Sequence, residues 1–183
     1  MQTPQRLYTC GHGTADEIAL SSLLRSAGVR AVVDVRSVPK SRAHPHVWAQ
    51  RLAQWVPDLA GASYSWSQDL GGFRKPLPES PNVALRHPSF RGYADYMQTD
   101  AFAGALGRLV AGAAAVPTAI MCSETLWWRC HRRLISDALV LTHAVRVEHL
   151  MHAGAPQVHR LTEGVRLRAD GRLQYDVIAP PDQ

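Results

Sequence analysis

Short apolar strands alternate with helical segments along this chain, and this alternation constrains its fold more than any other feature. The segments VRAVVDV (29–35) and VPTAIMC (116–122) are rich in β-branched residues and are apolar on both faces. Strands of this kind lie in parallel sheets that helices cover on both sides. The segments between them have helical periodicity. The sequence therefore predicts an α/β domain with a mainly parallel central sheet flanked by helices.

The other elements follow from local patterns. We expect further strands at 6–10, 62–66 and 144–150, and helices beginning near residue 14 and at 45–56, 94–114 (restarting at Thr99) and 127–142. Thr14 and Glu17 have the spacing of a capping box, which predicts that the first helix begins there. Gly28 has the place of a C-terminal stop for the same helix.

Two segments differ from this alternation. Residues 69–93 have no periodicity and are interrupted by prolines and glycines, which predicts a long loop, and such loops in compact domains are usually functional or disordered. Residues 164–177 alternate around an Asp-Gly pair, which is typical of a β-hairpin. We therefore predict a single domain over 1–183, with a core at about 6–150 and a hairpin extension at about 156–178.

Composition narrows the class of protein. The formal net charge is +5, and the basic residues are mostly arginines, whose guanidinium groups match phosphate and carboxylate geometry. No apolar run approaches the roughly 20 residues of a membrane helix, and the N-terminal segment lacks a signal-peptide core. We expect a cytoplasmic protein with no membrane partner. Three cysteines at irregular spacing indicate reduced thiols rather than a disulfide framework.

Polar side chains gather after the predicted strands, and in a parallel α/β sheet ligands bind outside the carboxyl ends of the strands. In chain order the clusters are Cys10-Gly11-His12-Gly13; Asp34, Arg36, Lys40 and Arg42; Asp69, Gly71, Gly72, Arg74 and Lys75; and Cys122, Glu124, Arg129, Cys130, His131 and Arg132. We therefore predict one pocket at this edge of the sheet, containing His12, Arg36, Cys122 and Glu124.

Cys122 is the candidate nucleophile. It ends a predicted strand and precedes a helix expected to begin near Trp127. The free N–H groups of that helix, together with Arg129 and Arg132, would lower the pKa of the Cys122 thiol. The alternative is that Cys122 is a small buried core residue. We interpret Cys130 as a packing residue of the helix.

The remaining candidates serve proton transfer and anion binding. Glu124 and His12 are the candidate acid–base residues. His12, which stands between glycines ahead of a helix, also resembles an anion-binding turn. Asp34 and Arg36 share one face of a strand, so they either pair with each other or orient a substrate. The other candidate anion-binding residues are Arg42, Arg74, Arg91 and Arg132.

A metal-binding protein is one alternative. Cys122, Cys130 and His131, with Cys10, are of the types that ligate soft metals. However, the spacing Cys-x7-Cys-His is not a recognised zinc pattern. We therefore assign no metal ligand and no cofactor.

A nucleic-acid-binding module is the other alternative. Basic residues of the 69–93 loop would contact phosphates, and tryptophans would stack on bases. Trp127 and Trp128 are consecutive, so one of them should be exposed, whereas Trp48 and Trp55 are expected in the core. The partner is thus an anionic small molecule or nucleic acid. The sequence indicates no oligomeric state.

Five motifs together resemble one family. They are YTCGHGT, VDVRSVPKSR, DLGGFRKP, SFRGYADYM, and MCSE followed by CHRRLISDAL. In this order, over about 7–150, they resemble the domain of unknown function 488 family, which implies an α/β fold with these motifs at one end of the sheet and no particular reaction. The resemblance marks as signature positions His12, Asp34, Arg36, Arg42, Gly71, Gly72, Arg91, Tyr93, Cys122, Glu124, Cys130, His131 and Arg132. Cys10 stands where the family usually has an aliphatic residue, so it is not expected in a shared mechanism.

These observations favour an enzyme over the two alternatives. It would act on a phosphate-bearing substrate in a pocket of cysteine, arginine and histidine side chains at the carboxyl edge of the sheet.

Overall fold

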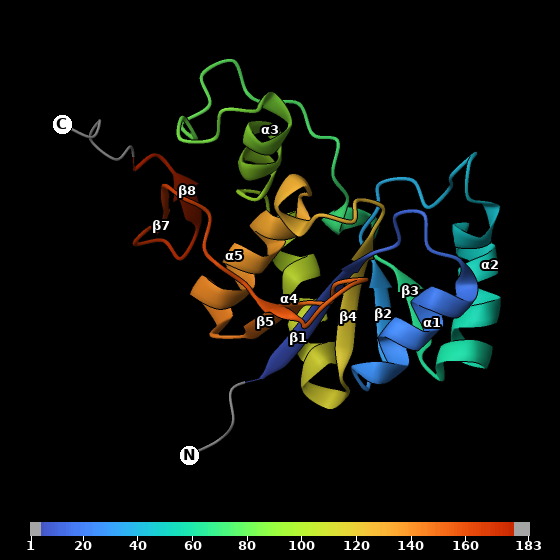
Figure 1. Cartoon of the computed structure of the whole chain (residues 1–183). Coiled ribbons are helices and arrows are strands. Elements are labelled where there is room, and N and C mark those ends of the chain that lie inside the picture. Colours follow the sequence, from blue (N-terminus) through green and yellow to red (C-terminus); the bar gives the residue numbers. More distant parts are fainter. Residues whose placement is uncertain (1–4, 178–183) are drawn as a thin grey trace.

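Six strands form one central sheet in the computed structural model, which describes residues 5–177 (Figure 1). The strands are β1 (Arg6–Gly11), β2 (Ala31–Asp34), β3 (Ser63–Trp66), β4 (Thr118–Cys122), β5 (Arg146–His149) and β6 (Gln157–Val158). Their order across the sheet is β3-β2-β4-β1-β5-β6, and only β6 runs antiparallel to its neighbour. The predicted α/β fold with a mainly parallel sheet is therefore confirmed.

Helices cover both faces of this sheet, as Figure 1 shows. They are α1 (Glu17–Ser26), α2 (Ala49–Trp55), α3 (Pro88–Tyr96), α4 (Asp100–Ala115) and α5 (Arg132–His143). Buried residues of α1 and α2 form one hydrophobic core, and those of α3, α4 and α5 form the other. No helix among residues 5–177 is both long enough and apolar enough to cross a membrane.

The register of β4 and β1 decides which core each cysteine enters. Successive side chains of a strand point to opposite faces of the sheet. Along β4, Met121 lies in the core with α1 and α2, whereas Cys122 lies in the core with α4 and α5. On β1, Cys10 lies on the α1 and α2 face. The sheet therefore separates Cys10 from Cys122.

Two predicted helix starts are wrong. Helix α1 begins at Glu17, because Asp16 is the N-cap and its carboxylate accepts a hydrogen bond from the Ala19 N–H at 2.8 Å. Thr14 is therefore not the cap. The helix expected from Trp127 begins only at Arg132, after a 3-10 turn.

The predicted loop over 69–93 is also too long. Helix α3 begins inside it at Pro88, since proline is well suited to a first helical position. The restart that the sequence predicts is confirmed, because Thr99 caps α4 through a hydrogen bond from the Phe102 N–H to its hydroxyl.

The predicted C-terminal hairpin is confirmed. Strand β7 (Val165–Leu167) pairs antiparallel with β8 (Leu173–Tyr175). The Ala84 N–H donates to the Tyr175 carbonyl, and the Tyr175 N–H donates to the Asn82 side-chain oxygen. These bonds attach the hairpin to the loop before α3. Residue 178, the end of the predicted extension, lies outside the described residues.

Candidate functional site

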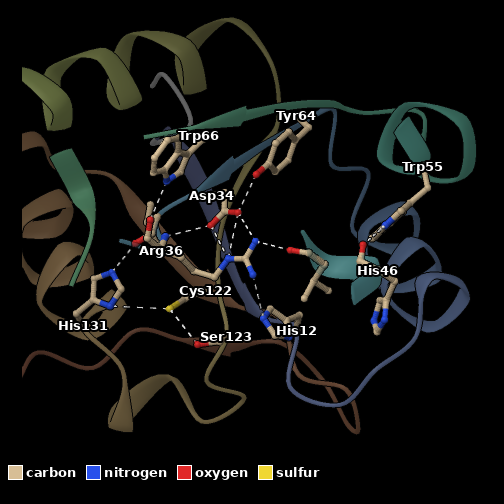
Figure 2. Close-up of polar contacts among 12 residues, drawn as sticks. His12, Asp34, Arg36, His46, Trp55, Tyr64, Trp66, Cys122, Ser123 and His131 are labelled. Carbon is tan, nitrogen blue, oxygen red and sulfur yellow. Dashed lines mark hydrogen bonds and ion pairs between the residues drawn. The ribbon is translucent and has the colours of Figure 1, made fainter. Parts of the chain in front are cut away.

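A cavity of about 740 Å³ opens at the carboxyl edge of the sheet. His12 after β1, Arg36 after β2, and Cys122 and Glu124 at the end of β4 all line it. The structure thus brings together the four residues that the strand-end argument selected, although they are far apart in the chain. Figure 2 shows polar contacts around His12, Arg36, Cys122 and His131.

The end of β1 is held tightly against the segment after β4. The N–H groups of His12 and Gly13 donate to the carbonyls of Cys122 and Ser123, each at 2.9 Å. Gly13 has a φ of +51°, and a Cβ there would overlap the Thr125 hydroxyl, so only glycine permits this approach. Because carbonyl groups already occupy both N–H groups, the interpretation of this turn as an anion-binding turn is wrong.

His12 is an uncharged ring at neutral pH. Its Nδ1–H donates to the Gly13 carbonyl at 2.9 Å, so its Nε2 is unprotonated and accepts from Arg36 Nη1 at 3.4 Å (Figure 2). Burial lowers the pKa of His12 to about 4. His12 therefore offers a lone pair to this region and no positive charge.

Asp34 and Arg36 pair with each other. Arg36 Nη2 donates to Asp34 Oδ2 at 2.5 Å and Nε donates to Oδ1 at 2.9 Å, and both side chains are buried (Figure 2). The Tyr64 hydroxyl donates to the same carboxylate at 2.8 Å, and Arg36 also donates to the Val47 carbonyl at 2.7 Å. The charge of Arg36 is thus neutralised inside the fold, which favours a role in positioning the end of β2.

Two thiols and an imidazole form a cluster on the other side of the cavity. His131 Nε2–H donates to the Val35 carbonyl at 2.9 Å, so in the neutral ring Nδ1 carries the lone pair. This Nδ1 lies 3.9 Å from Cys122 Sγ and 3.7 Å from Cys130 Sγ. The three atoms all lie within 4.8 Å of one another. We call Cys122, Cys130 and His131 the thiol–imidazole cluster.

Arg132 explains the charge of this cluster. Its side chain is buried, and none of the carboxylates among residues 5–177 pairs with it. Its Nε donates to Cys130 Sγ at 3.3 Å, Nη1 donates to the Thr9 hydroxyl at 3.1 Å, and Nη2 donates to the Glu124 carbonyl. A buried guanidinium without a counter-charge is costly. Of these contacts, the Cys130 sulfur alone can become an anion, so Arg132 favours the thiolate form of Cys130.

The two cluster thiols have opposite acidities. Burial raises the pKa of Cys130, but the hydrogen bond from Cys122 and the charge of Arg132 outweigh burial and hold it well below its usual value. The hydrogen bond with Cys130, and then burial, raise the pKa of Cys122. The expectation of a low pKa at Cys122 is therefore wrong. The physical reason is that α5 begins five residues later than expected and directs Arg132 at Cys130.

A buried hydrogen-bonded chain holds Arg132 from behind. Asp137 Oδ1 accepts from His159 Nε2–H at 2.9 Å, so His159 Nδ1 accepts from His149 Nε2–H at 3.0 Å. His149 Nδ1 then accepts from the Thr9 hydroxyl at 2.7 Å, which leaves the Thr9 oxygen to accept from Arg132. Each donor direction follows from the one before it. The chain therefore has a single consistent arrangement of protons when both histidines are neutral.

Sequence reasoning missed this chain. Burial lowers the pKa of His149 to about 3, which agrees with a neutral ring, and Trp127 stacks on that ring at 4.1 Å. The residues of the hydrogen-bonded chain come from β1, β5, α5 and the segment after β6, so no sequence spacing joins them. One signal was available, because His149 ends β5 just as Cys122 ends β4.

The other predicted residues are divided between the cavity and its surroundings. Glu124 is exposed, and its carboxylate accepts from the Leu126 N–H at 3.2 Å. Tyr93 is buried in the cavity wall, where its hydroxyl donates to the Leu70 carbonyl at 2.8 Å and its ring lies 5.0 Å from that of His131. Both therefore contact the cavity.

Several predicted anion-binding arginines lie elsewhere. Arg42 is exposed outside the cavity lining, Arg74 stacks on the Tyr96 ring at 3.6 Å, and Arg91 donates to the Arg86 carbonyl at 3.4 Å. Arg132 is also outside the lining, behind Cys130. The cationic side chains that do line the cavity, besides Arg36, are Lys40 and Arg129.

The tryptophans follow the prediction only in part. Trp127 is buried and Trp128 is exposed at the cavity, as expected for a consecutive pair. Trp55 is buried in the core, but Trp48 is 37% exposed because its indole N–H donates to the surface carbonyl of Ser41.

The fold and this cavity define a class of protein: a mainly parallel α/β domain with cysteine, arginine and histidine side chains at the carboxyl edge of its sheet. A family model described as "Domain of unknown function DUF488" matches residues 16–139, which is more than half of the chain. The chain belongs to the DUF488 family, as its motifs predicted. Neither a search of curated proteins nor a search of solved structures found a match.

Proposed function

We propose that the protein is an enzyme that binds a small phosphate-bearing substrate in this cavity and acts on it at the thiol–imidazole cluster. One observation carries the proposal: uncompensated cationic side chains and the cluster line the same cavity. Such an arrangement places an anion beside a reactive centre, which is how enzymes orient a substrate for chemistry.

The binding half of the site rests on Lys40 and Arg129. Asp34 compensates the charge of Arg36, and the Cys130 thiolate compensates that of Arg132. Within residues 5–177, neither Lys40 nor Arg129 forms an ion pair. Both line the cavity, so their charges are available to a ligand. Arginine in particular suits the oxygens of a phosphate group.

The rim of the cavity suits a substrate with an apolar ring. Phe73, Phe90 and Trp128 all line it, and Phe73 is 94% exposed. Phe73 has a φ of +55°, a strained conformation for an aromatic residue, and such strain is concentrated at functional sites. Aromatic side chains stack on flat rings. The substrate class that fits is therefore a phosphate ester of an aromatic or heterocyclic group.

The reacting half of the site is the cluster with Glu124. The Cys130 sulfur lines the cavity and meets Arg132. As a thiolate it would either attack the phosphorus of the ester, which releases the alcohol or phenol and leaves a phosphocysteine for water to hydrolyse, or ligate a metal ion that activates the substrate. Glu124 is exposed in the same cavity and can exchange a proton with a bound substrate or water.

Binding of inorganic phosphate and phenyl phosphate, measured by calorimetry on chelator-treated protein, tests this proposal. We expect Lys40→Gln and Arg129→Gln each to weaken phosphate binding by about 10-fold, because each removes a charged contact. Arg42→Gln is the matched control, since Arg42 is exposed but lies outside the cavity lining. Phe73→Ala should weaken phenyl phosphate and leave inorganic phosphate unchanged.

Protection of Cys130 connects the two halves. Bound phenyl phosphate should slow the alkylation of Cys130 by iodoacetamide, followed by mass spectrometry. An Arg42→Gln variant that loses as much affinity as Arg129→Gln would contradict the proposal. That result would instead favour an extended basic surface of the kind that binds nucleic acid.

A further inference from the structure

We infer that Cys122, Cys130 and His131 are the protein ligands of one thiophilic divalent metal ion of the zinc class, in the wall of the cavity. The inference deepens the proposed function, because it specifies the reactive centre that would act on the bound anion. It differs from the sequence prediction, which assigned no metal ligand since the spacing of these residues matches no zinc pattern.

The distances between the donor atoms suit a tetrahedral ion. Zinc bonds of about 2.3 Å to sulfur and about 2.0 Å to nitrogen place a sulfur and a nitrogen about 3.5 Å apart in a tetrahedral site. The Nδ1 atom of His131 lies 3.9 Å from Cys122 Sγ and 3.7 Å from Cys130 Sγ. All three donor atoms lie within 4.8 Å of one another, so shifts of less than about 1 Å would complete the site.

The imidazole of His131 is already oriented as a ligand. Figure 2 shows one of its ring nitrogens directed at the Cys122 sulfur, and its other ring nitrogen contacts the Val35 carbonyl. The Nε2–H donates to the carbonyl at 2.9 Å, which leaves the lone pair on Nδ1, on the side of the sulfurs. Histidine ligands of metals almost always donate their other N–H to a carbonyl, a carboxylate or a water in this way.

Arg132 positions one of the sulfur ligands. The buried Arg132 donates to Cys130 Sγ at 3.3 Å and is itself held through Thr9. Arg132 is therefore a second-shell partner of the Cys130 ligand, and a cysteine binds metal as the thiolate. Cys122 would lose its proton when the ion binds.

Gly72 leaves space beside the third ligand. A Cβ at Gly72 would lie 3.1 Å from His131 Nδ1, closer than packed side chains normally approach. Gly72 and the three ligands all line the cavity, so the remaining coordination position faces the substrate space. Zinc sites with three protein ligands and one open position are typically catalytic. An ion held there would polarise a bound phosphate or activate a water molecule.

Cobalt(II) binding to chelator-treated protein tests the inference without an activity assay. We expect one equivalent of cobalt(II) to bind with thiolate-to-cobalt charge-transfer absorption and the strong visible bands of a four-coordinate ion. Cys130→Ser, Cys122→Ser and His131→Gln should each weaken binding more than the 10- to 100-fold expected for a lost second-shell partner. Cys10→Ala is the matched control, because Cys10 is buried on the opposite face of the sheet.

Circular dichroism of each variant separates a lost ligand from a lost fold. Gly72→Ala, which keeps all three ligands, should weaken cobalt(II) binding by about 10-fold because it crowds His131. Absence of the cobalt(II) bands, or bands that survive His131→Gln and disappear in Cys10→Ala, would overturn the inference. If metal-free protein binds phosphate but no cobalt(II) site is found, the metal inference fails and the proposed anion pocket stands. If the protein binds cobalt(II) but Arg129→Gln does not change its phosphate binding, only the proposed anion pocket fails.

Discussion

Arg36 and Arg132 are both buried at the carboxyl edge of the sheet, yet the protein balances their charges in different ways. Arg36 is 5% exposed and pairs with the Asp34 carboxylate, whereas Arg132 is 1% exposed and meets the Cys130 sulfur. A carboxylate is anionic at neutral pH with or without an arginine. A buried thiol becomes anionic only with help from its neighbours, here a hydrogen bond from Cys122 together with the charge of Arg132. An arginine is therefore paired with a permanent anion at one position and with an ionisable thiol at the other.

Each arginine also has a neutral histidine near it. His12 Nε2 accepts directly from Arg36, and His149 is joined to Arg132 through the Thr9 hydroxyl. Burial keeps both rings uncharged, so neither adds a like charge next to a buried guanidinium. A neutral histidine thus lies near each arginine, directly bonded at Arg36 and joined through Thr9 at Arg132, while the counter-charge differs between the two regions.

The largest effect should come from removing a counter-charge. We expect Asp34→Asn to lower the free energy of unfolding by about 3–5 kcal/mol, because it leaves Arg36 buried and unpaired. Urea unfolding measures this. Adding Arg36→Met to the same variant should recover part of the loss, since it removes the unpaired charge. If Arg36→Met makes the variant less stable still, then charge does not explain the loss.

The corresponding change beside Arg132 is Cys130→Ser, in metal-free protein. It should cost about 1–2 kcal/mol more than Cys10→Ser, because it also removes the counter-ion of Arg132. Burial raises the pKa of Cys10 to about 11, so that thiol is neutral and a fair control. If the two variants lose the same free energy of unfolding, then Cys130 is not the counter-charge of Arg132. The proposed difference between Arg36 and Arg132 would then be wrong.

The two regions also differ in how far the sequence reveals them. Asp34 and Arg36 lie two residues apart on a strand, a spacing that predicts a shared face, and the strand-end rule brought His12, Cys122 and Glu124 to the same cavity. The fold was predictable for a similar reason, because β-branched runs and an Asp-Gly turn are local signals. Contacts of this kind follow from short-range geometry.

The contact between Arg132 and Cys130 was not predictable in that way. The apolar periodicity continues back to Trp127, but the chain forms a 3-10 turn there and α5 begins at Arg132. That shift moves Arg132 from Cys122 to Cys130. The series of hydrogen bonds behind Arg132 depends on long-range packing, since Thr9 and His149 are 140 positions apart in the sequence.

The third prediction concerns pH. The unfolded histidines titrate near pH 6.5, whereas the folded pKa of His12 is about 4 and that of His149 is about 3. Between these values the unfolded chain binds protons that the folded protein excludes, so stability is complete above pH 6.5 and falls as the pH is lowered. We expect each histidine to contribute about 1.4 kcal/mol of loss per pH unit in its window.

Substitution separates the two histidines. His12→Gln should remove its contribution between pH 6.5 and 4, whereas the contribution that His149→Gln removes should extend to about pH 3. Urea unfolding at several pH values measures both slopes, and His143→Gln, on the exposed end of α5, is the control. A pH dependence that neither buried variant changes would mean that carboxylates alone set the acid stability.

The last two changes sharpen the comparison at the carboxylates themselves, and Tyr64→Phe should have the smallest effect of all. The Tyr64 hydroxyl donates to Asp34 at 2.8 Å, and the Tyr175 hydroxyl donates to Asp137 at 2.9 Å. Tyr64→Phe should cost about 0.5–1 kcal/mol, because Asp34 keeps its ion pair with Arg36. Tyr175→Phe should cost about 1–3 kcal/mol, because it leaves a buried carboxylate that has no arginine or lysine partner among residues 5–177.

This difference follows from what remains after each hydroxyl is removed. Asp137 would keep only the N–H groups of His159 and Thr162, both on its other oxygen. The anion would then be satisfied by neutral donors on one side alone, and the chain that ends at Arg132 would lose part of its support. Urea unfolding of the two variants measures the difference. A larger loss for Tyr64→Phe than for Tyr175→Phe would mean that the charge beside the carboxylate does not decide the cost.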